Sequence, residues 1–401
     1  MRQVAVNVYE VSKLDVEPGE LPRTMVAWVL RPEREGSLSD AFKIEEVEVP
    51  EPGPFEAIVR VMAAGVNFNS IWAALGEPVS IFAYGDHPRW GHHIAGSDAS
   101  GIVWKVGAGV RRWKPGDEVV LHANQASYED PEVHGLDPLA APSQLGWGYQ
   151  TTWGSFAQFA KVQAQQLLPK PTHLSWVDCS AYGVTYFTAY RMLIDRCGLG
   201  AGDNVLIWGA AGGMGVFATQ LCAVAGARAV GVVSSAEKGR LVRELGAVDY
   251  VDRREFGPGD GGRFVERVAQ ILGDAPDIVF EHVGKDTFPL SVAAVKRFGK
   301  VVTCGATSGY MLALDGHNLV NGQKQIIGSH AANAYECWRA NQLIIDGSIR
   351  PVLWRAMRFD ELPEAHRLLH ENRHVGKLSI VVGARDEQEG STGAGPGAIW
   401  V

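Results

Sequence analysis

The sequence is poor in cysteine and lacks the cysteine patterns that mark metal sites or disulfide frameworks. Its 401 residues contain five cysteines, an odd number, with no CxxC pair, so we expect reduced thiols packed as small apolar side chains. Several histidines are candidate ligands, but none of them shows the i, i+4 spacing that brings two ligands together on a helix. These candidates are His92, His93, His122, His134, His282 and His330. No metal site is predicted.

The sequence also lacks runs of one charge sign and long apolar runs. Its formal net charge of −8 comes from interspersed acids and bases, which argues against nucleic-acid binding and against a polybasic membrane tail. No apolar run approaches the roughly 18 residues that cross a membrane, and residues 1–15 lack the features of a secretory leader. We therefore expect a cytoplasmic protein whose partner is a small molecule.

The hydrophobic pattern changes character partway along the chain. Residues 25–170 contain short β-branched runs cut by glycine and proline, which is typical of a β-rich, barrel-like unit. From Trp176 onward, apolar helices and strands alternate at a spacing that predicts a parallel sheet with helices on both faces. A last helix and strand, within residues 358–382, are assigned back to the first domain. The low-complexity segment 387–398 is expected to be mobile, apart from any contact made by the last three residues.

These patterns predict an α/β protein of two domains, which is also what the length and the 46% hydrophobic content favour. We expect residues 1–180 together with 345–401 to form a catalytic, substrate-binding domain. Residues 181–344 are expected to form a doubly wound, nucleotide-binding domain.

A glycine-rich turn carries the strongest chemical signal. The apolar strand Val205–Trp208 runs into GAAGGMG, which opens an apolar helix. Such a turn lets the backbone approach a pyrophosphate, whose charge is stabilised at the helix N-terminus, and the flanking strand and helix make the motif specific. The cofactor-binding residues predicted in this turn are Gly209, Ala211, Gly212, Gly213, Met214 and Gly215.

The end of the next strand indicates which dinucleotide is bound. An enzyme for the non-phosphorylated cofactor usually carries an acid there, about 20 residues after the turn, whereas this chain has Ser234 and Ser235 followed by Lys238 and Arg240. These side chains could hold a 2′-phosphate through charge-assisted hydrogen bonds, so NADPH is favoured over NADH. The alternative is that Lys238 and Arg240 simply belong to a solvated helix face.

Further motifs stand in the order found in one large superfamily. They are Asn67 in GVNFNS, GSDASG at 96–101, KPGDEVV at 114–120, the Thr188-Ala189-Tyr190 helix, GAAGGMG and Gly376-Lys377. The series resembles the medium-chain dehydrogenase/reductases over residues 25–383. This resemblance implies a GroES-like β-rich catalytic domain and a Rossmann domain. Asn67 and Ser97 stand where zinc enzymes of the superfamily carry a cysteine and a histidine, and the four-cysteine lobe is missing, which implies a zinc-free double-bond reductase.

A narrower likeness rests on longer blocks. These blocks are residues 66–82, WGYQTTWG, VVSS, DIVFEHVG, TCGATSGYM and residues 326–344. Together they resemble the crotonyl-CoA carboxylase/reductases. In that family NADPH delivers a hydride to the β-carbon of an enoyl-CoA, and the enolate then attacks CO2 to give an alkylmalonyl-CoA. Without CO2 a proton is taken up and the saturated thioester results. The resemblance also implies a homodimer or homotetramer, with Rossmann units meeting through sheet edges.

The resemblance implies particular site residues. An oxyanion and a CO2 molecule need preorganised neutral donors in a dry pocket, and the family pattern implies His330 and an asparagine in these roles. We favour Asn69 for CO2, with Asn67 nearer the nicotinamide; His330 has a structural alternative, since a histidine that ends a strand is often structural. Residues that shield and order the pocket are Tyr149 and Gln150, and further cofactor contacts are Thr188, His282, Cys304 and Ala306.

Three departures from the family pattern leave alternatives open. Many members carry phenylalanine and glutamate where this chain has Tyr149 and Gln150, and a neutral amide offers one acceptor oxygen and two donors in place of an anion. The segment 183–190 and the pair His317-Asn318 also differ from the family pattern, at positions expected near the acyl chain or CoA. A 2-enoyl-thioester or enone reductase without carboxylation is the second hypothesis, and a non-catalytic NADPH-binding protein is the third.

Overall fold

A computed structural model describes residues 11–84, 90–135 and 137–401. Residues 1–10 lie outside the described residues. They are part of residues 1–15, for which the sequence predicts no secretory leader. The chain divides into two compact units, residues 1–184 with 333–401 and residues 185–332. The helix α11 (Ala334–Ile345) falls in the first unit, where Asn341 donates to the carbonyl of Pro169, whereas the expected nucleotide domain extends to residue 344.

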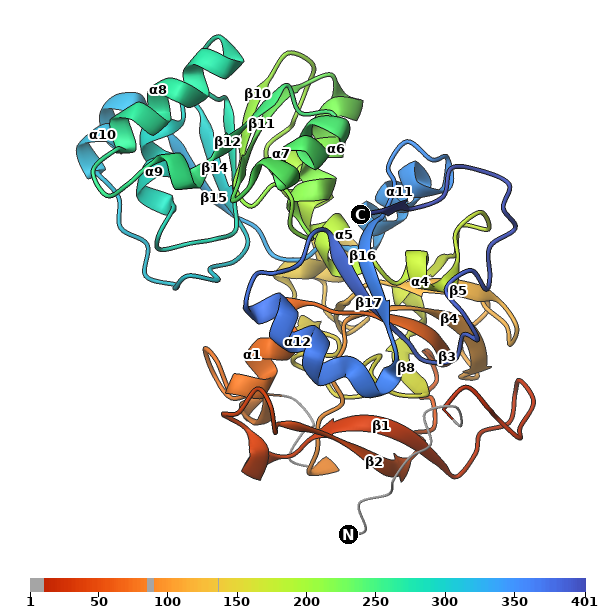
Figure 1. Cartoon of the computed structure of the whole chain (residues 1–401). Helices are drawn as coiled ribbons and strands as arrows, with labels where there is room; N and C mark the ends of the chain where they lie inside the picture. Colours follow the sequence, from red (N-terminus) through yellow and green to blue (C-terminus); the bar gives the residue numbers. More distant parts are fainter. Residues whose placement is uncertain (1–10, 85–89, 136) are drawn as a thin grey trace. The chain divides into compact units, whose positions relative to one another are not determined.

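The first unit is built on a β-sheet whose strands run β18-β16-β17-β3-β4-β5-β9, with β8 also pairing with β3 (Figure 1). The bounds are β3 (Glu56–Gly65), β4 (Asp98–Val106), β5 (Glu118–Leu121), β8 (Phe159–Gln163), β9 (Leu167–Pro169), β16 (Val352–Met357), β17 (Lys377–Val381) and β18 (Ile399–Trp400). Nine of the ten residues of β3 are buried, and this strand pairs with β17, β4 and β8. This is the β-rich unit that the short β-branched runs predict.

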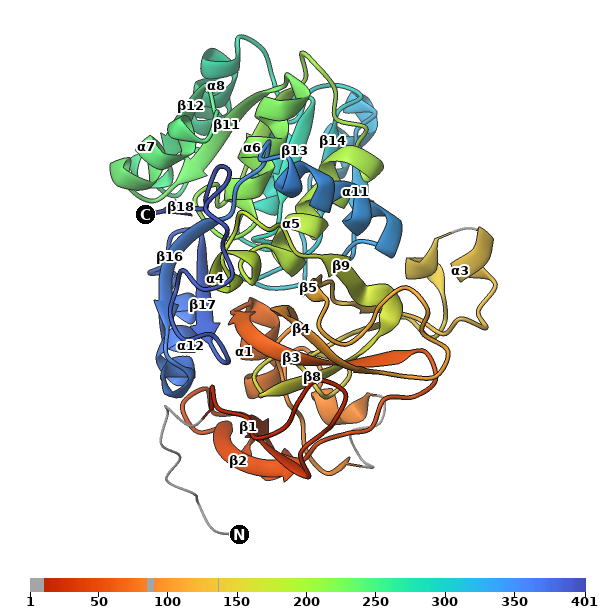
Figure 2. The same ribbon diagram turned by 90° about the vertical axis from the view of Figure 1, so that its right-hand side faces the viewer.

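Smaller elements complete the first unit. The strands β1 (Thr24–Leu30) and β2 (Phe42–Glu48) form an antiparallel pair, and β6 (Asn124–Gln125) pairs with β7 (Leu145–Gly146). The helices are α1 (Phe68–Leu75), α3 (Glu132–Gly135), α4 (Trp176–Cys179), α11 and α12 (Leu362–His370). Figure 2 shows α12 beside β16 and β17, so the last helix and strand lie within this unit.

The C-terminal segment is held against the first unit. Lys170 donates to the carbonyl of Gly390, Thr392 N–H donates to the carbonyl of Thr172, and β18 pairs with β16 in parallel. Composition alone predicts a mobile segment at 387–398. The difference arises because backbone groups of this segment find partners on the unit, which composition does not reveal.

The second unit contains a six-stranded parallel sheet of order β12-β11-β10-β13-β14-β15. Its strands are β10 (Asn204–Ile207), β11 (Arg228–Val233), β12 (Asp249–Asp252), β13 (Ile278–Glu281), β14 (Lys300–Thr303) and β15 (Gln325–Gly328). The order reverses next to β10, as in doubly wound dinucleotide-binding folds, where ligands bind at the carboxyl ends of the strands. The Rossmann fold predicted from the alternating pattern is therefore confirmed.

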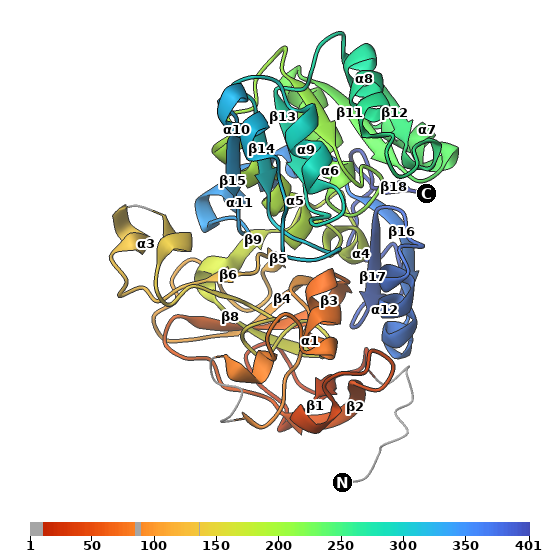
Figure 3. The ribbon, with the colours of Figure 1, turned by 90° about the vertical axis from the view of Figure 1, so that its left-hand side faces the viewer.

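Helices cover both faces of this parallel sheet. They are α6 (Gly215–Ala225), α7 (Ala236–Glu244), α8 (Gly261–Leu272), α9 (Phe288–Ala294) and α10 (Gly316–Gly322). On one face, the β11 side chains Val230 and Val232 pack into a core with Phe264 of α8, and α8 lies beside α9 (Figure 3). On the opposite face, Gly231 lies against Val242 of α7, where a Cβ would overlap that side chain.

The helix α5 (Gly183–Tyr190) begins in the first unit and ends in the second. It continues as a π-helical segment, Arg191–Arg196. The sequence predicts one continuous helix over this stretch, and the change of winding has no signal in its apolar spacing.

Candidate active site

The glycine-rich turn has little room for a side chain at its first and last glycines, Gly209 and Gly215. Gly209 has a φ of 57°, which favours glycine. A Cβ on Gly215 would overlap the carbonyl oxygen of Gly209, because the first turn of α6 lies directly against the end of β10. The N–H of Gly212 donates to the Gly209 carbonyl, while Gly212, Gly213 and Met214 keep part of their surface exposed. The turn therefore has the tight, accessible backbone that a pyrophosphate requires.

The ends of β13 and β14 bring further predicted cofactor residues beside this turn. The imidazole of His282 lies against Gly209 and shares a hydrogen bond of 3.0 Å with the carbonyl of Trp208. Burial lowers the pKa of His282, although the neighbouring Glu281 opposes this, so the ring is neutral near pH 7. The thiol of Cys304 lies 3.7 Å from the sulfur of Met214.

A buried polar network holds this end of the sheet rigid. Glu281 is 0% exposed, and its carboxylate accepts hydrogen bonds from Thr287, Ser291 and the N–H groups of Val283 and Gly284. The fully satisfied carboxylate thus fixes the loop that follows β13. Burial raises the pKa of Cys304 to about 12, so its thiol is not a nucleophile here. Ala306 is buried against Gly284.

The end of β11 places two serines at the start of α7, which carries Lys238. Ser235 caps α7, since its hydroxyl accepts from the N–H of Lys238 at 3.2 Å, and Ser234 is half-buried beside it. Burial lowers the pKa of Lys238, and the nearby Arg253 lowers it further. Arg240 is exposed on α7. Lys238 and Arg253 lie close enough to repel each other, and a bound phosphate dianion would relieve this repulsion.

Arg253 is a residue that the sequence reasoning missed. It follows β12, which pairs directly with β11 in register Val233↔Asp252. The carboxyl ends of neighbouring parallel strands meet at one edge of a sheet. A cation at the start of the loop after β12 is therefore expected beside the end of β11. The neighbouring Arg254 is occupied by an ion pair with Asp252.

The two candidate asparagines differ in what their amides contact. Asn69, in the first turn of α1, donates from Nδ2 to the hydroxyl of Ser97 at 2.9 Å. Asn67 is only 6% exposed, and its Oδ1 accepts from the ammonium of Lys377. Its Nδ2 is buried and has no hydrogen-bond partner in the described part of the chain. An unfilled buried donor is costly, which makes it a candidate ligand contact.

Lys377 links this asparagine to a buried carboxylate. Its Nζ donates to the carbonyl of Val66 at 3.0 Å and to Oδ2 of Asp98 at 3.1 Å. The other carboxylate oxygen of Asp98 accepts from the N–H of Val184. Burial lowers the pKa of Lys377, and the Asp98 carboxylate acts in the opposite direction.

The loop Gly146–Gly154 is anchored by its tryptophans. Trp147 is 1% exposed and donates from its indole to the carbonyl of Lys161. Trp153, with a φ of 67°, packs edge-on against Trp90 at 5.1 Å. A Cβ on Gly148 would overlap the carbonyl oxygen of Gly96. These tryptophans are therefore core residues of the first unit.

Tyr149 and Gln150 lie between these anchors and are half-buried. The hydroxyl of Tyr149 donates to the carbonyl of Glu77 at 3.1 Å. The side-chain oxygen of Gln150 accepts from the N–H of Gly146 at 2.9 Å, within its own loop. The Gln150 carbonyl is therefore occupied, and the donor group of the amide is the part left for a ligand.

Thr188 and His330 belong to the second unit. Thr188 is buried within α5. His330 follows β15, and this residue is exposed. The packing around its ring, together with the nearby Arg191 guanidinium, lowers the pKa of His330, so its imidazole is neutral near pH 7. A neutral imidazole carries one N–H donor, as the predicted role requires.

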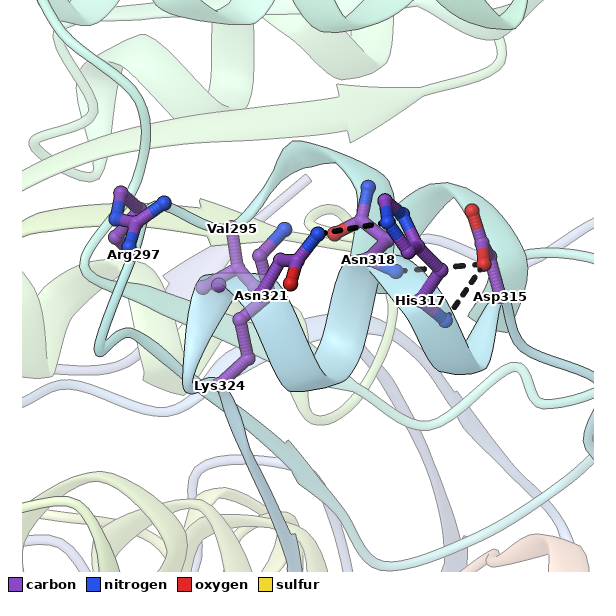
Figure 4. A pocket seen from close by; sticks show the side chains of 8 residues that line it. Val295, Arg297, Asp315, His317, Asn318, Asn321 and Lys324 are labelled. Atoms are coloured by element: carbon purple, nitrogen blue, oxygen red, sulfur yellow. Dashed lines mark hydrogen bonds between the residues drawn. The ribbon is translucent and has the colours of Figure 1, made fainter.

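A cavity of about 350 Å³ opens in the second unit beside α10 (Figure 4). Its lining combines cations and amides: Val295, Arg297, Asp315, His317, Asn318, Asn321, Gly322 and Lys324. Asp315 is turned to the N-terminus of α10, where it accepts from the N–H groups of His317 and Asn318. The Lys324 ammonium donates to the carbonyl of Val292 at 2.6 Å.

Two searches of the described residues gave negative findings. Outside the gaps at 1–10, 85–89 and 136, no group of three or more His, Cys, Asp or Glu side chains is placed to hold a metal ion. In the same residues, every helix is too short or too polar to span a membrane.

Comparison with known proteins agrees with both halves of the fold. The alcohol dehydrogenase GroES-like domain matches residues 53–172, and the zinc-binding dehydrogenase family matches residues 213–345. The chain is therefore a member of the medium-chain dehydrogenase/reductase superfamily, with a GroES-like domain and a Rossmann domain.

Closer relatives narrow the class. The crotonyl-CoA carboxylase/reductase of Cereibacter sphaeroides is 43% identical, over 94% of this chain and 92% of that protein. The crotonyl-CoA reductase of Streptomyces avermitilis is 41% identical, over 87% of this chain and 85% of that protein. A solved structure of the 2-octenoyl-CoA carboxylase reductase CinF with NADP and 2-octenoyl-CoA matches with a TM-score of 0.89 and 38% identity, over 93% of this chain and 91% of that chain. This protein belongs to the crotonyl-CoA carboxylase/reductase family.

Proposed function

We propose that this enzyme catalyses the NADPH-dependent reductive carboxylation of an α,β-unsaturated acyl-CoA to an alkylmalonyl-CoA. The family membership supports the reaction class, and relatives with bound NADP and 2-octenoyl-CoA support the choice of cofactor and thioester. NADPH would supply the hydride to the β-carbon of the enoyl thioester. The residues of this chain would bind, orient and shield the reactants.

The buried, unfilled Nδ2 of Asn67 is the observation that carries the proposal. Reductive carboxylation develops negative charge on the thioester oxygen and needs a neutral donor for a CO2 oxygen, and both acceptors suit an amide N–H in a dry site. One N–H of the Asn69 amide is donated to Ser97, whereas the Nδ2 of Asn67 has no partner in the described part of the chain, so the contacts favour Asn67 as the donor to substrate. Asn69 would then hold the first turn of α1 against Ser97.

On the second unit, the glycine-rich turn would hold the pyrophosphate of NADPH. The serines at the end of β11, with Lys238 and Arg253, would hold its 2′-phosphate by charge-assisted hydrogen bonds. The rigid loop after β13 would keep His282 and Gly284 in place against the cofactor. His330 would supply its neutral imidazole N–H as a donor to the thioester.

The cavity beside α10 is the proposed site for phosphate groups of the thioester's CoA. Arg297 and Lys324 bring positive charge to it, and His317, Asn318 and Asn321 bring polar groups. The helix-capping Asp315 has its carboxylate engaged with backbone N–H groups, which reduces its repulsion of an anion. Since His317-Asn318 replaces a basic residue and a tyrosine of the family pattern, a carrier other than CoA is the competing reading of this cavity.

The test is product analysis over a panel of enoyl thioesters. Purified protein is incubated with NADPH and crotonyl-CoA or longer 2-enoyl-CoAs, with and without bicarbonate, and products are separated by mass. Alkylmalonyl-CoA formed only with bicarbonate is the expected result. If saturated thioester were the sole product, the carboxylation proposal would be refuted. The second candidate, a plain enoyl-thioester reductase, would remain. That candidate is favoured by Gln150, whose neutral amide replaces the family's glutamate.

We also propose a homodimer or homotetramer. The strand β15 lies at the end of the six-stranded sheet, and β15 and the neighbouring helix α10 expose Ile326 and Val320, which are 39% and 72% exposed. Such an apolar sheet edge is a natural surface for a second copy. Sedimentation of the wild type against Val320→Glu measures this, and a monomeric wild type would contradict it.

A further inference from the structure

Lys377 sits where three buried segments of the first unit meet. Its ammonium donates to the Val66 carbonyl, the Asn67 side-chain oxygen and the Asp98 carboxylate, and the residue is 3% exposed. The strand β17, which begins at Lys377, pairs with β3, and the N–H of Val66 donates to the carbonyl of Leu378 at 3.0 Å. The lysine and the asparagine are therefore held in a fixed register.

The chemistry of the ammonium decides how the Asn67 amide is oriented. A lysine ammonium has three donors and no acceptor, so only the carbonyl end of an amide can face it. With Oδ1 engaged in this way, Nδ2 must point in the opposite direction, where it is buried and meets no acceptor among the described residues. A side chain that could donate or accept in either direction is thereby reduced to a donor.

Asp98 keeps this orientation in place. It is 0% exposed, one carboxylate oxygen pairs with Lys377, and the other accepts from the Val184 N–H. A Cβ on Gly65 or on Gly183 would come too close to the Asp98 side chain, so the carboxylate is packed as well as bonded. A buried ion pair is weak evidence for stability, because its desolvation cost offsets its attraction. The contacts instead support a role for this ion pair in setting the direction of the Asn67 side chain.

We propose that Lys377 is a positioning residue, which together with Asp98 fixes Asn67 as a one-directional hydrogen-bond donor to an oxygen of the reacting substrate. This inference rests on the proposed function, since Asn67 is the proposed donor. It adds that the donor works only while the lysine occupies the amide oxygen.

A double-mutant cycle tests the inference. Asn67→Ala, Lys377→Met and the double variant are assayed with NADPH, crotonyl-CoA and bicarbonate, following NADPH oxidation and the ratio of carboxylated to saturated product. If Lys377 acts through Asn67, each single variant loses on the order of tenfold or more in kcat/KM, and the double variant loses no more than Asn67→Ala alone. Additive losses, or an unchanged rate in either single variant, would overturn it.

A matched control separates positioning from stability. Lys170 is also a buried lysine of the first unit, and its ammonium donates to the carbonyl of Gly390. Lys170→Met should lower the thermal midpoint without moving the product ratio or the KM for crotonyl-CoA. If Lys377→Met does not fold, because Asp98 is left unpaired, the cycle uses Lys377→Met with Asp98→Asn, which removes both charges.

The outcomes for the two proposals are distinct. A wild type that makes only saturated product refutes the carboxylation, while the cycle is still measured from NADPH oxidation. A wild type that carboxylates but shows additive losses refutes the positioning role alone. A wild type that oxidises no NADPH with any enoyl-CoA overturns both.

Discussion

At the scale of single residues, amide side chains that are close in sequence differ in which hydrogen-bonding groups they have left for a ligand. Asn67 and Asn69 are two positions apart, yet Asn67 has an occupied oxygen and an open donor group, whereas Asn69 donates one of its two N–H groups to Ser97. Gln150 resembles Asn67 in this respect, since its oxygen accepts from the Gly146 N–H. What each amide can offer a ligand depends on these partners as well as on residue type.

Gln150→Glu should raise the ratio of carboxylated to saturated product about tenfold. A glutamate keeps the acceptor for the Gly146 N–H and presents a charged second oxygen, and hydrogen bonds to a charged group contribute about 1.5 kcal/mol or more. The ratio of alkylmalonyl to saturated thioester, measured by mass spectrometry, checks this. Gln144→Glu, in the same segment, controls for the added charge. An unchanged ratio in Gln150→Glu would count against this account of the position.

Acid should destabilise the first unit through His366, whose Nε2 is hydrogen-bonded to the Ser70 hydroxyl at 2.9 Å. Burial lowers the pKa of His366 to about 3, below the unfolded value of about 6.5, so the unfolded chain binds the extra proton between these values. This histidine's contribution is complete above about pH 6.5 and falls by about 2 kcal/mol by pH 5.

Urea unfolding at pH 7 and pH 5 measures this effect, with His366→Phe as the test variant. The loss of stability between the two pH values should be smaller in His366→Phe than in the wild type. His134→Phe, at an exposed position, should keep the wild-type difference. Equal pH dependence in His366→Phe and the wild type would show that this histidine is protonated in the folded state.

At the scale of elements, the parallel sheet and its glycine-rich turn could be predicted from sequence because their signals are local. An apolar strand, a glycine-rich turn and an apolar helix follow one another within residues 205–225. The π-helical winding at 191–196 and the partners of the 387–398 segment depend on contacts far along the chain, and so leave no local pattern. Arg253 follows β12, and it is the pairing of β12 with β11 that brings it beside the end of β11.

The N-terminus of α7 should decide the choice between NADPH and NADH. Lys238→Ala and Arg253→Ala should each raise the KM for NADPH about tenfold, because each removes a cation from the proposed 2′-phosphate site. The KM for NADH should change little. Arg240→Ala, on the exposed face of the same helix, measures how far that second candidate contributes. Equal losses with both cofactors would place these cations outside the phosphate site.

At the scale of the whole molecule, the first unit is assembled from the two ends of the described chain. Residues 333–401 return to it and supply β16, β17 and β18 to its sheet, together with Lys377. The sequence pattern predicts a last helix and strand, and we assign this pair to the first domain. It does not predict that the final residues pair with β16, because a two-residue strand carries no pattern.

Removal of residues 399–401 should therefore destabilise the first unit. The N–H groups of Ile399 and Val401 donate to the carbonyls of Pro351 and Leu353, and two such hydrogen bonds contribute about 2 kcal/mol together. The thermal midpoint should fall by about 5 °C, with the product ratio unchanged. An unaltered midpoint, measured by calorimetry, would show that the strand pairing contributes nothing.

The crowding around the loop Gly146–Gly154 limits how an engineer could diversify it. Gly148 and Gly154 press against the backbone of residues 95 and 96, and Trp147 and Trp153 fill two separate cores. A random library over the loop would consist mostly of misfolded protein. A library confined to Tyr149 and Gln150 would retain the scaffold, so these two positions are the ones in the loop that can be varied usefully.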